Sequence, residues 1–373
     1  MLTWAQVCAR RLARHHLAAP AASAAQAAAA VGGIHAQIMS AAEVSVGLRV
    51  AGLTRAGVRD ALWTERTLVK TRGPRYTVHL LAATDLPMWT GALSALPTRR
   101  LELLTDEQAE LVVAALADVL ADAEWTTGEL TDHVVARTGS WAGDPVMDAF
   151  QGKWPRWIEA MPLASRRGVM CFGANRGRNV TYTHPARWLP GFTPMDADAA
   201  LAEVVHRYLY AYGPATPAHF ARWMAAPPGW AAQLFSSLGF LEQVTVDGEP
   251  AFVIAGDTGM PDEPPAGVRL LPYFDAYGVG CFPRERVFPG RAFERALAGG
   301  QAGNYPLLLI DGAVGGVWHQ RRSGKRIAVT VEPFGRLNAA RKRDLEAEVA
   351  RIGEILEATA TLTIGEVKVG PHA

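Results

Sequence analysis

The sequence predicts an α+β fold in which three groups of helices each end in a β-hairpin, followed by a β-rich region. Three observations favour it. Helical patterns dominate the first 240 residues, strand-turn-strand patterns follow the helices three times, and strands prevail after a linker at 256–267 rich in Pro, Asp and Gly. Helices followed by a two-stranded hairpin are the order of the winged-helix unit, a helix-turn-helix variant.

The first unit is assigned to residues 1–100. Pro20 and the Gly32-Gly33 pair interrupt the helical pattern, because proline and glycine disfavour a helix interior. Helices are therefore expected at 3–17, 21–31, 38–50 and 55–64. Strands at 67–72 and 75–81 are joined through Arg72-Gly73-Pro74, which predicts a basic hairpin.

The same order recurs in a second unit, 101–192, and a third, 193–257. In the second, helices are expected at 105–123, from Thr126 onward and at 145–161, before a basic strand-turn-strand at 166–183. Thr126 followed by Glu129 indicates a capping box. In the third, helices are expected at 196–212, 217–225 and 228–238, and a hairpin at 241–254 turns at Asp247-Gly248.

The β-rich region is assigned to residues 258–373. Strands are expected at 270–275 and 305–312, then a hairpin at 315–331 whose Ser323-Gly324 tip carries four basic residues. A charged helix at 335–357 and a strand at 360–364 complete the chain.

Composition excludes several protein classes. The chain has 373 residues, 49% of them hydrophobic and 20% charged, and a net charge of +1, which excludes a strongly basic nucleic-acid-coating protein but not local basic patches. Three distant cysteines give neither metal-ligand spacing nor a disulfide framework, which favours the reducing cytoplasm. No apolar run of about 18 residues predicts a membrane helix. The Ala-rich run at 18–30 after an Arg-rich segment loosely mimics an export signal, but Pro20 favours two helices.

Several segments together resemble one known family. Gly33-Ile-His-Ala-Gln and the helix ending at Arg49 resemble the Gly-Leu-Gln-Ala-Gln segment and its helix in the AlkZ/YcaQ-like winged-helix DNA glycosylases. The strand with Arg72, Arg75, Thr77 and His79 is similar to the family's Arg-Gly-Thr-hydrophobic-His strand. Phe274-Asp275 and residues 311–318 resemble its C-terminal half, so the resemblance spans about 5–365.

The resemblance implies tandem winged-helix units in a C shape around a DNA channel. It also implies hydrolysis of the N-glycosidic bond of bulky or cross-linking N7-alkylguanines, without metal or cofactor, in DNA repair or in self-resistance to a DNA-alkylating natural product. The partner would be double-stranded DNA carrying an alkylated guanine, and we expect a monomer with no membrane association. No lysine is placed by the motif to form a Schiff base, so a monofunctional glycosylase is expected.

The catalytic motif departs from both known forms, which are Gln-x-Gln and Gln-x-Asp. Here it is His35-Ala36-Gln37. A carboxamide can donate to and accept from one water, and an imidazole, with an ordinary pKa near ~6.5, can polarise that water. Residues i and i+2 share a face only in an extended segment, so 34–37 is expected to be non-helical with His35 and Gln37 both facing DNA. The alternative is that His35 is a packed, hydrogen-bonded residue.

Basic residues crowd three hairpin turns and are expected to reach DNA phosphates. The alternative is ordinary solubilisation of each hairpin. Tyr76 is a candidate for stacking on a base, and His79 either lines the channel or fills core. The predicted DNA-binding residues are Arg72, Arg75, Tyr76, His79, Arg176, Arg178, Arg321, Arg322, Lys325 and Arg326.

Three neighbours of the motif have open or structural roles. Asp275 is either a buried structural carboxylate or a neighbour of the site. Glu43 is expected on a solvated helix face, with assistance at the site as the alternative. Trp318 is expected in the core, with stacking on an exposed base as the alternative.

Two rival functions remain. A non-catalytic winged-helix regulator predicts sequence-selective binding, usually by a dimer on a palindrome. A degenerate family member would only shield DNA or sequester a drug.

Overall fold

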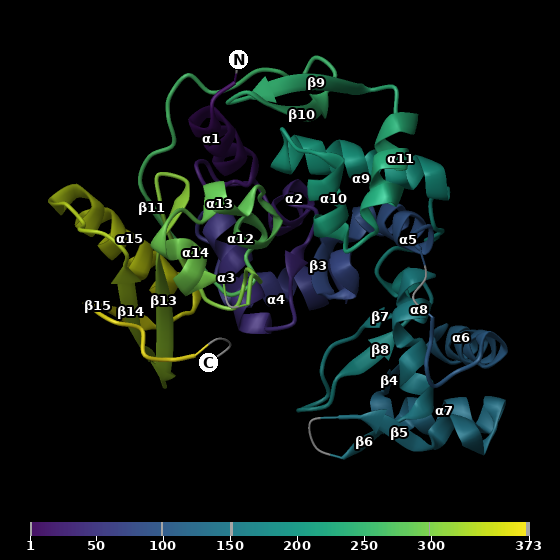
Figure 1. Ribbon diagram of the computed structural model, residues 1–373. Coiled ribbons are helices and arrows are strands. Elements are labelled where there is room, and N and C mark those ends of the chain that lie inside the picture. Colours follow the sequence, from purple (N-terminus) through teal and green to yellow (C-terminus); the bar gives the residue numbers. More distant parts are fainter. Residues whose placement is uncertain (1, 98–99, 150–151, 298, 371–373) are drawn as a thin grey trace. The chain divides into compact units, whose positions relative to one another are not determined.

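The computed structural model describes residues 2–97, 100–149, 152–297 and 299–370, and it confirms a mixed α+β fold (Figure 1). The chain forms two compact units. One, here called the split unit, joins residues 1–61 to 205–373, and the other, the middle unit, contains 62–204. The four-part division expected from the sequence stays a prediction. Within the described ranges, no helix is both long and apolar enough to cross a membrane.

The N-terminal helices of the split unit follow the expected order. They are α1 (Trp4–Arg14), α2 (Ala24–Ala30), α3 (Met39–Arg49) and α4 (Arg55–Trp63), whose last residues enter the middle unit. Gly32 and Gly33 have positive φ angles of 67° and 104°. Glycine adopts this conformation at no steric cost, so the pair ends α2 and leads into the short strand β1 (Ile34–His35).

Helices and a hairpin follow where the chain returns to the split unit. They are α9 (Ala197–Tyr212), α10 (Pro217–Met224), α11 (Pro228–Ser237), β9 (Leu241–Val246) and β10 (Glu249–Ile254). The hairpin turns at Asp247 and Gly248, which both have positive φ. A two-residue turn of this kind matches the twist of the strands, and it confirms the expected hairpin.

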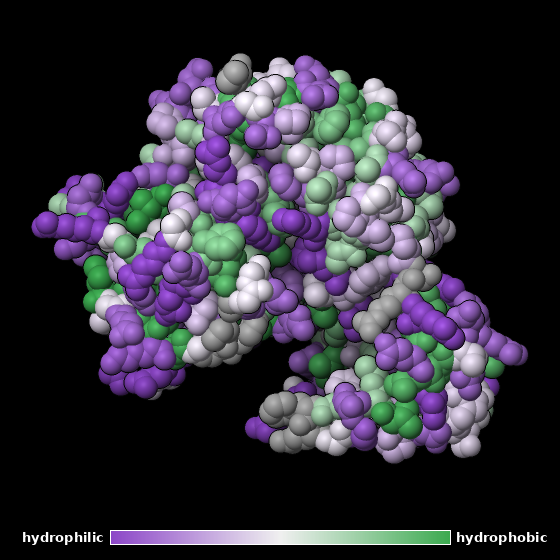
Figure 2. Space-filling model, in the orientation of Figure 1, coloured by the Kyte–Doolittle hydropathy of each residue, from purple (hydrophilic) through white to green (hydrophobic). Residues whose placement is uncertain are grey.

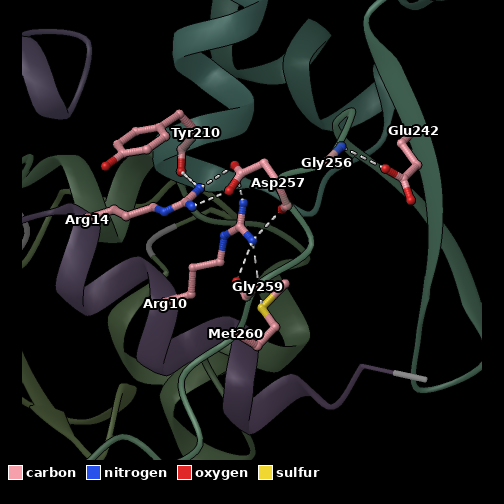
Figure 3. A network of polar contacts seen from close by, with 8 residues as sticks. All are labelled: Arg10, Arg14, Tyr210, Glu242, Gly256, Asp257, Gly259 and Met260. Atoms are coloured by element: carbon pink, nitrogen blue, oxygen red, sulfur yellow. Dashed lines mark hydrogen bonds and ion pairs between the residues drawn. The ribbon is translucent and has the colours of Figure 1, made fainter.

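The linker after this hairpin is held against α1 (Figure 3). Asp257 forms ion pairs with Arg10 and Arg14, both at 2.6 Å. The Arg10 guanidinium also donates to the carbonyls of Asp257 and Gly259, at 2.8 and 3.0 Å. The first helix therefore fixes the path of a segment that has no regular structure of its own.

A five-stranded sheet dominates the C-terminal region. Its order is β11 (Val268–Leu271), β12 (Leu307–Ile310), β13 (Ala313–Ser323), β14 (Arg326–Pro333) and β15 (Thr359–Ile364). Only the β14–β15 pair is parallel, and α15 (Ala339–Ile355) provides the crossover that a parallel pair requires. Trp318, Val329 and Ile352 pack in the core between α15 and the sheet. Three short helices between β11 and β12 were not predicted, namely α12 (Ala276–Gly280), α13 (Arg284–Val287) and α14 (Arg291–Ala296).

The middle unit begins with the first basic hairpin. β2 (Leu68–Arg72) pairs antiparallel with β3 (Val78–Ala82). The expected second strand begins too early, because Pro74–Tyr76 forms a 3-10 turn in which Arg75 and Tyr76 have positive φ. Proline has no N–H for the strand ladder, which explains the later start.

The rest of the middle unit contains α5 (Leu86–Ser94), α6 (Asp106–Leu120), α7 (Thr127–Thr138) and α8 (Met161–Arg166), with strands β4 (Glu124–Thr126), β7 (Cys171–Phe172) and β8 (Thr181–Thr183) in the order β4-β8-β7. Thr126 and Glu129 form the expected capping box. The hydrophobic core of the middle unit contains Leu116, Trp157 and Met161.

The expected helix at 145–161 is wrong. The described residues there form the hairpin β5 (Pro145–Asp148) and β6 (Lys153–Pro155), then a 3-10 segment to Ala160. Pro155 would disrupt the middle of such a helix, and Gly152 has a φ of 84°. The helix α8 begins only at Met161.

Candidate active site

The His35-Ala36-Gln37 motif lies on extended chain, which confirms that this segment is non-helical. His35 ends β1, and Ile38, which precedes α3, has an extended backbone with φ −108° and ψ 103°. The two polar side chains differ in accessibility. Gln37 is exposed, whereas only 8% of the His35 surface is accessible. Gln37 can therefore meet a ligand directly, and His35 has little open surface.

An aromatic ring packs against His35. The imidazole is stacked on Phe274, with ring centroids 4.6 Å apart and planes 25° from parallel. Phe274 follows the end of β11 and has a positive φ of 56°, which is uncommon for a residue other than glycine. The stack covers a face of the imidazole and leaves its nitrogens on the ring edge, where hydrogen bonds form.

Asp275 is a buried carboxylate in an ion pair. Its two oxygens accept from the two terminal nitrogens of Arg49, each at 2.8 Å, and one also accepts from Ser45 Oγ at 2.7 Å. The Tyr277 N–H donates to it at 3.0 Å, so Asp275 also caps α12. Burial alone would raise the pKa of Asp275, but the Arg49 charge and these hydrogen bonds hold that pKa below its ordinary value.

Other ionisable groups near this cluster are also buried. His15 is fully buried between Tyr212 and Tyr277. Burial, together with the positive charge of Arg49, lowers the pKa of His15 to about 3. Glu43, expected on a solvated face, is instead 1% exposed and accepts from Arg59 Nε at 2.6 Å. Most residues of α3 are buried, because the helix contacts both α2 and α15, and this leaves no solvated face for Glu43.

The arginines of the β2–β3 turn interact with other residues of the same hairpin. The Arg72 guanidinium donates to the Tyr76 carbonyl at 2.9 Å, and burial lowers the pKa of Arg72. His79 is 1% exposed, and its Nδ1 lies 2.9 Å from the Thr77 carbonyl. Arg75 is half-buried beside it, with a guanidinium nitrogen 3.4 Å from His79 Nε2. His79 thus fills core within its unit.

Tyr76 lies between two contacts in the middle unit. Its hydroxyl donates to the Pro97 carbonyl at 3.5 Å, and the Arg166 guanidinium lies 5.3 Å from its ring centroid. The ring remains partly exposed.

The second basic turn holds one paired and one unpaired arginine. Arg176 forms an ion pair with the Glu129 carboxylate, whose pKa is lowered to about 2 by hydrogen bonds from Thr126 and by Arg176. Arg178 is exposed, with no ion-pair or hydrogen-bond partner among the residues that the structure describes. Of these two arginines, Arg178 is the one whose charge is not balanced by a carboxylate of the described residues.

The β13–β14 hairpin presents the densest basic group. Arg321, Arg322, Lys325 and Arg326 are all exposed, and Figure 2 shows a hydrophilic patch at this end of the hairpin, at the lower left. Arg322 donates to the carbonyls of Gly324 and Leu356, at 3.0 and 3.1 Å, which orders its side chain. Trp318 lies further along β13 and is buried, with its indole N–H donating to the Leu271 carbonyl.

The structure therefore brings part of the predicted site together. His35, Phe274 and Asp275 form one contiguous cluster with α3 in the split unit, and four basic residues gather on one hairpin of that unit. Sequence reasoning missed Phe274, Ser45 and Arg49 as neighbours of the motif. Ser45 and Arg49 are four residues apart on α3, a spacing that places them on one helix face.

Comparison with known proteins agrees with the fold. The sequence model described as "DNA glycosylase AlkZ-like" matches residues 28–355. An "Interstrand DNA cross-link repair glycosylase" of Streptomyces sahachiroi is 31% identical over 345 residues, covering 85% of this chain and 87% of that protein. The solved structure of Streptomyces sahachiroi DNA glycosylase AlkZ superposes with a TM-score of 0.82 at 26% identity, covering 98% of this chain and 100% of the other. The chain therefore belongs to the AlkZ-like family of DNA glycosylases.

Proposed function

We propose that this DNA glycosylase hydrolyses the N-glycosidic bond of N7-alkylguanine in duplex DNA, and that it acts on bulky and cross-linking adducts. The observation that carries the proposal is the placement of His35 and Gln37 two positions apart on extended chain. The name of the Streptomyces sahachiroi relative, a cross-link repair glycosylase, supports the substrate class. Such an activity would serve DNA repair or self-resistance to an alkylating natural product.

Hydrolysis of this N-glycosidic bond requires little from the protein beyond a water molecule held next to C1′. Alkylation at N7 puts a positive charge on the purine, so the base leaves as a neutral molecule when its bond to C1′ breaks. A water then adds to C1′ and loses one proton, which leaves an abasic site. Gln37 can orient that water with its carboxamide, and His35 can accept the proton through a ring nitrogen.

Phosphate contacts would hold the duplex without reading its sequence. Arg178 and the β13–β14 group of Arg321, Arg322, Lys325 and Arg326 are the exposed candidates. We keep Arg72, Arg75, Tyr76 and Arg176 as proposed DNA contacts of secondary importance, because each is packed or paired within its own unit. His79 is 1% exposed, so its proposed part is to support the turn that carries Arg72 and Arg75 from within the core.

The test uses purified protein on two duplexes, one carrying N7-methylguanine and one carrying a bulky N7 adduct. His35→Ala and Gln37→Ala are each expected to lower single-turnover base release by about 100-fold or more, as loss of a general base or a water ligand does. His206→Ala and Gln233→Ala are the matched controls, because both lie on helices away from the motif. Base release at the wild-type rate by both motif variants would contradict the assignment.

A further inference from the structure

The stacked pair of His35 and Phe274 joins two segments far apart in the sequence. The imidazole lies nearly flat against the phenyl ring, at 4.6 Å between centroids and 25° between planes. Offset stacking of this kind restricts rotation of a ring about its side-chain bonds. The contact uses the face of the imidazole, whereas the ring nitrogens form their hydrogen bonds from the edge of the ring.

The backbone around Phe274 is built to hold that ring. Phe274 has a φ of 56°, and its N–H donates to the Gly303 carbonyl at 3.2 Å. A Cβ on Gly303 would lie 2.6 Å from Phe274 Cδ1, and Gly303 itself has a φ of 103°. Only glycine allows this approach, so the 303 loop forms a close-fitting support for the ring.

The residue after Phe274 is anchored to the helix that follows the motif. Asp275 is bonded to Ser45 and Arg49 of α3 at 2.7–2.8 Å, and the side chains of both Arg49 and Asp275 are fully buried. α3 begins at Met39, two residues after Gln37. The helix therefore holds both the segment that carries the motif and the carboxylate next to the stacked ring.

We propose that Phe274 is a positioning residue for His35, held in its left-handed conformation by the ion pair between Asp275 and Arg49. The inference rests on the proposed role of His35 in directing water. In this proposal Phe274 acts on the reaction through His35 and not by contact with the substrate. It fixes the plane of the imidazole, and hence the direction in which the ring nitrogens point.

The test compares three replacements of the ring. Phe274→Leu removes the aromatic face, Phe274→Met replaces the ring with a longer and more flexible apolar side chain, and Phe274→Tyr keeps the ring. Phe235→Leu is the matched control, since it removes a buried phenyl ring from the same unit, and that ring makes tilted and edge-on contacts with Phe220 and Phe252. Each variant is measured for kcat and KM on N7-methylguanine duplex and for thermal unfolding.

We expect Phe274→Leu and Phe274→Met to lower kcat by about 10- to 100-fold with KM little changed, as small misplacements of a catalytic group do. Phe274→Tyr should keep kcat close to the wild-type value. Phe235→Leu should lower the unfolding temperature without lowering kcat. Wild-type kcat in both Phe274→Leu and Phe274→Met would overturn the inference.

A second measurement does not depend on activity. The ring current of Phe274 should move the carbon-bound imidazole proton resonances of His35 upfield, and these should return downfield in Phe274→Leu and Phe274→Met but not in Phe274→Tyr. His35→Ala identifies the resonances. If His35→Ala is fully active while the resonances shift as expected, the stack exists and the proposed function fails. Resonances that do not respond to loss of the ring would refute the positioning role itself.

Discussion

The resemblance of His35-Ala36-Gln37 to the Gln-x-Gln motif predicts that His35 takes the place of a glutamine, and these two side chains differ in one property that matters to a bound water. Both can accept a hydrogen bond from it. Only the imidazole can take up a proton near neutral pH, and it then loses its acceptor nitrogen. The substitution therefore keeps the ability to hold water and adds a dependence on pH.

His35→Gln tests this difference. At neutral pH the variant should release base within about tenfold of wild type, a change of about 1.4 kcal/mol in barrier, because a carboxamide can hold the same water. As pH falls through the imidazole titration, wild-type kcat should decline because the protonated ring cannot accept, whereas kcat of the variant should stay level. Gln37→Ala is the control, since it should keep the acidic decline at a lower rate. An equal decline in His35→Gln would contradict the role.

A second residue-level expectation concerns the buried ion pair behind the stack. Arg49→Met should lower the free energy of unfolding by about 3–5 kcal/mol, because it leaves Asp275 charged and buried without its cationic partner. Arg55→Met is the control: its partner Glu357 is 43% exposed, so its loss should cost about 0–1 kcal/mol. Urea denaturation measures both. Equal costs for the two variants would show that burial does not set the strength of the Arg49 pair.

The sequence predicted the motif's local conformation but not its surroundings. Gly32-Gly33 indicated extended chain before His35, and the structure confirms it. The contact with Phe274 could not be read from spacing, because stacking between distant segments depends on the tertiary fold. The sequence left two roles open for Asp275, a buried structural carboxylate or a neighbour of the site. The structure shows that Asp275 is buried and paired with Arg49, next to the residue that stacks on His35.

At the level of elements, prediction succeeded where local chemistry was strong. The capping box at Thr126 and the Asp247-Gly248 turn each fix an element boundary through hydrogen bonds of neighbouring residues. It failed at 145–161, where an apolar pattern resembled a helix but Pro155 and Gly152 favoured a hairpin. The short helices between β11 and β12 were missed because each has only four to six residues, too few to show a helical period.

The turn between β7 and β8 permits a direct comparison of two arginines. Arg178→Gln should weaken binding to undamaged duplex and reduce the slope of log affinity against log salt by about 0.9, the value for one lost phosphate contact. Arg176→Gln should change the slope little, because Arg176 is already paired with Glu129. Fluorescence anisotropy over a salt series measures both slopes. A larger change of slope in Arg176→Gln than in Arg178→Gln would show that Arg176 leaves the Glu129 carboxylate and binds a DNA phosphate instead.

The clamp of Arg10 and Arg14 on Asp257 should make linker stability depend on pH (Figure 3). Partial burial opposes ionisation, but hydrogen bonds and charge from Arg14 and Arg10 hold the pKa of Asp257 below its ordinary value. Its stabilising effect is therefore present above the unfolded pKa, about 3.9, and is lost as pH falls through the lower folded pKa. The free energy of unfolding of wild type should exceed that of Asp257→Asn at neutral pH, and the gap should close only below about pH 4. A constant gap through that range would exclude the linkage.

For the whole molecule, the net charge of +1 means that DNA affinity must come from where the charges lie and not from their sum. The chain has 37 Lys and Arg against 36 Asp and Glu, so the four basic residues on β13–β14 are a local excess and not a property of the whole composition. Composition predicted only that local patches were possible. Which of the predicted basic residues remain unpaired depends on partners such as Glu129, which the fold supplies.

Two double variants with the same change of net charge separate the effect of where the charges lie from the effect of the net charge. Arg321→Gln with Lys325→Gln removes two charges from the hairpin, and Lys342→Gln with Arg343→Gln removes two exposed charges from α15. The hairpin variant should reduce the salt slope by roughly 2, about 0.9 per phosphate contact, and the α15 variant by much less. Wild-type protein should bind undamaged duplexes of unrelated sequence with similar affinity, since phosphate contacts carry no sequence information. A preference of about 1,000-fold or more for one sequence would instead indicate a regulator, and equal slopes for the two variants would show that net charge alone governs binding.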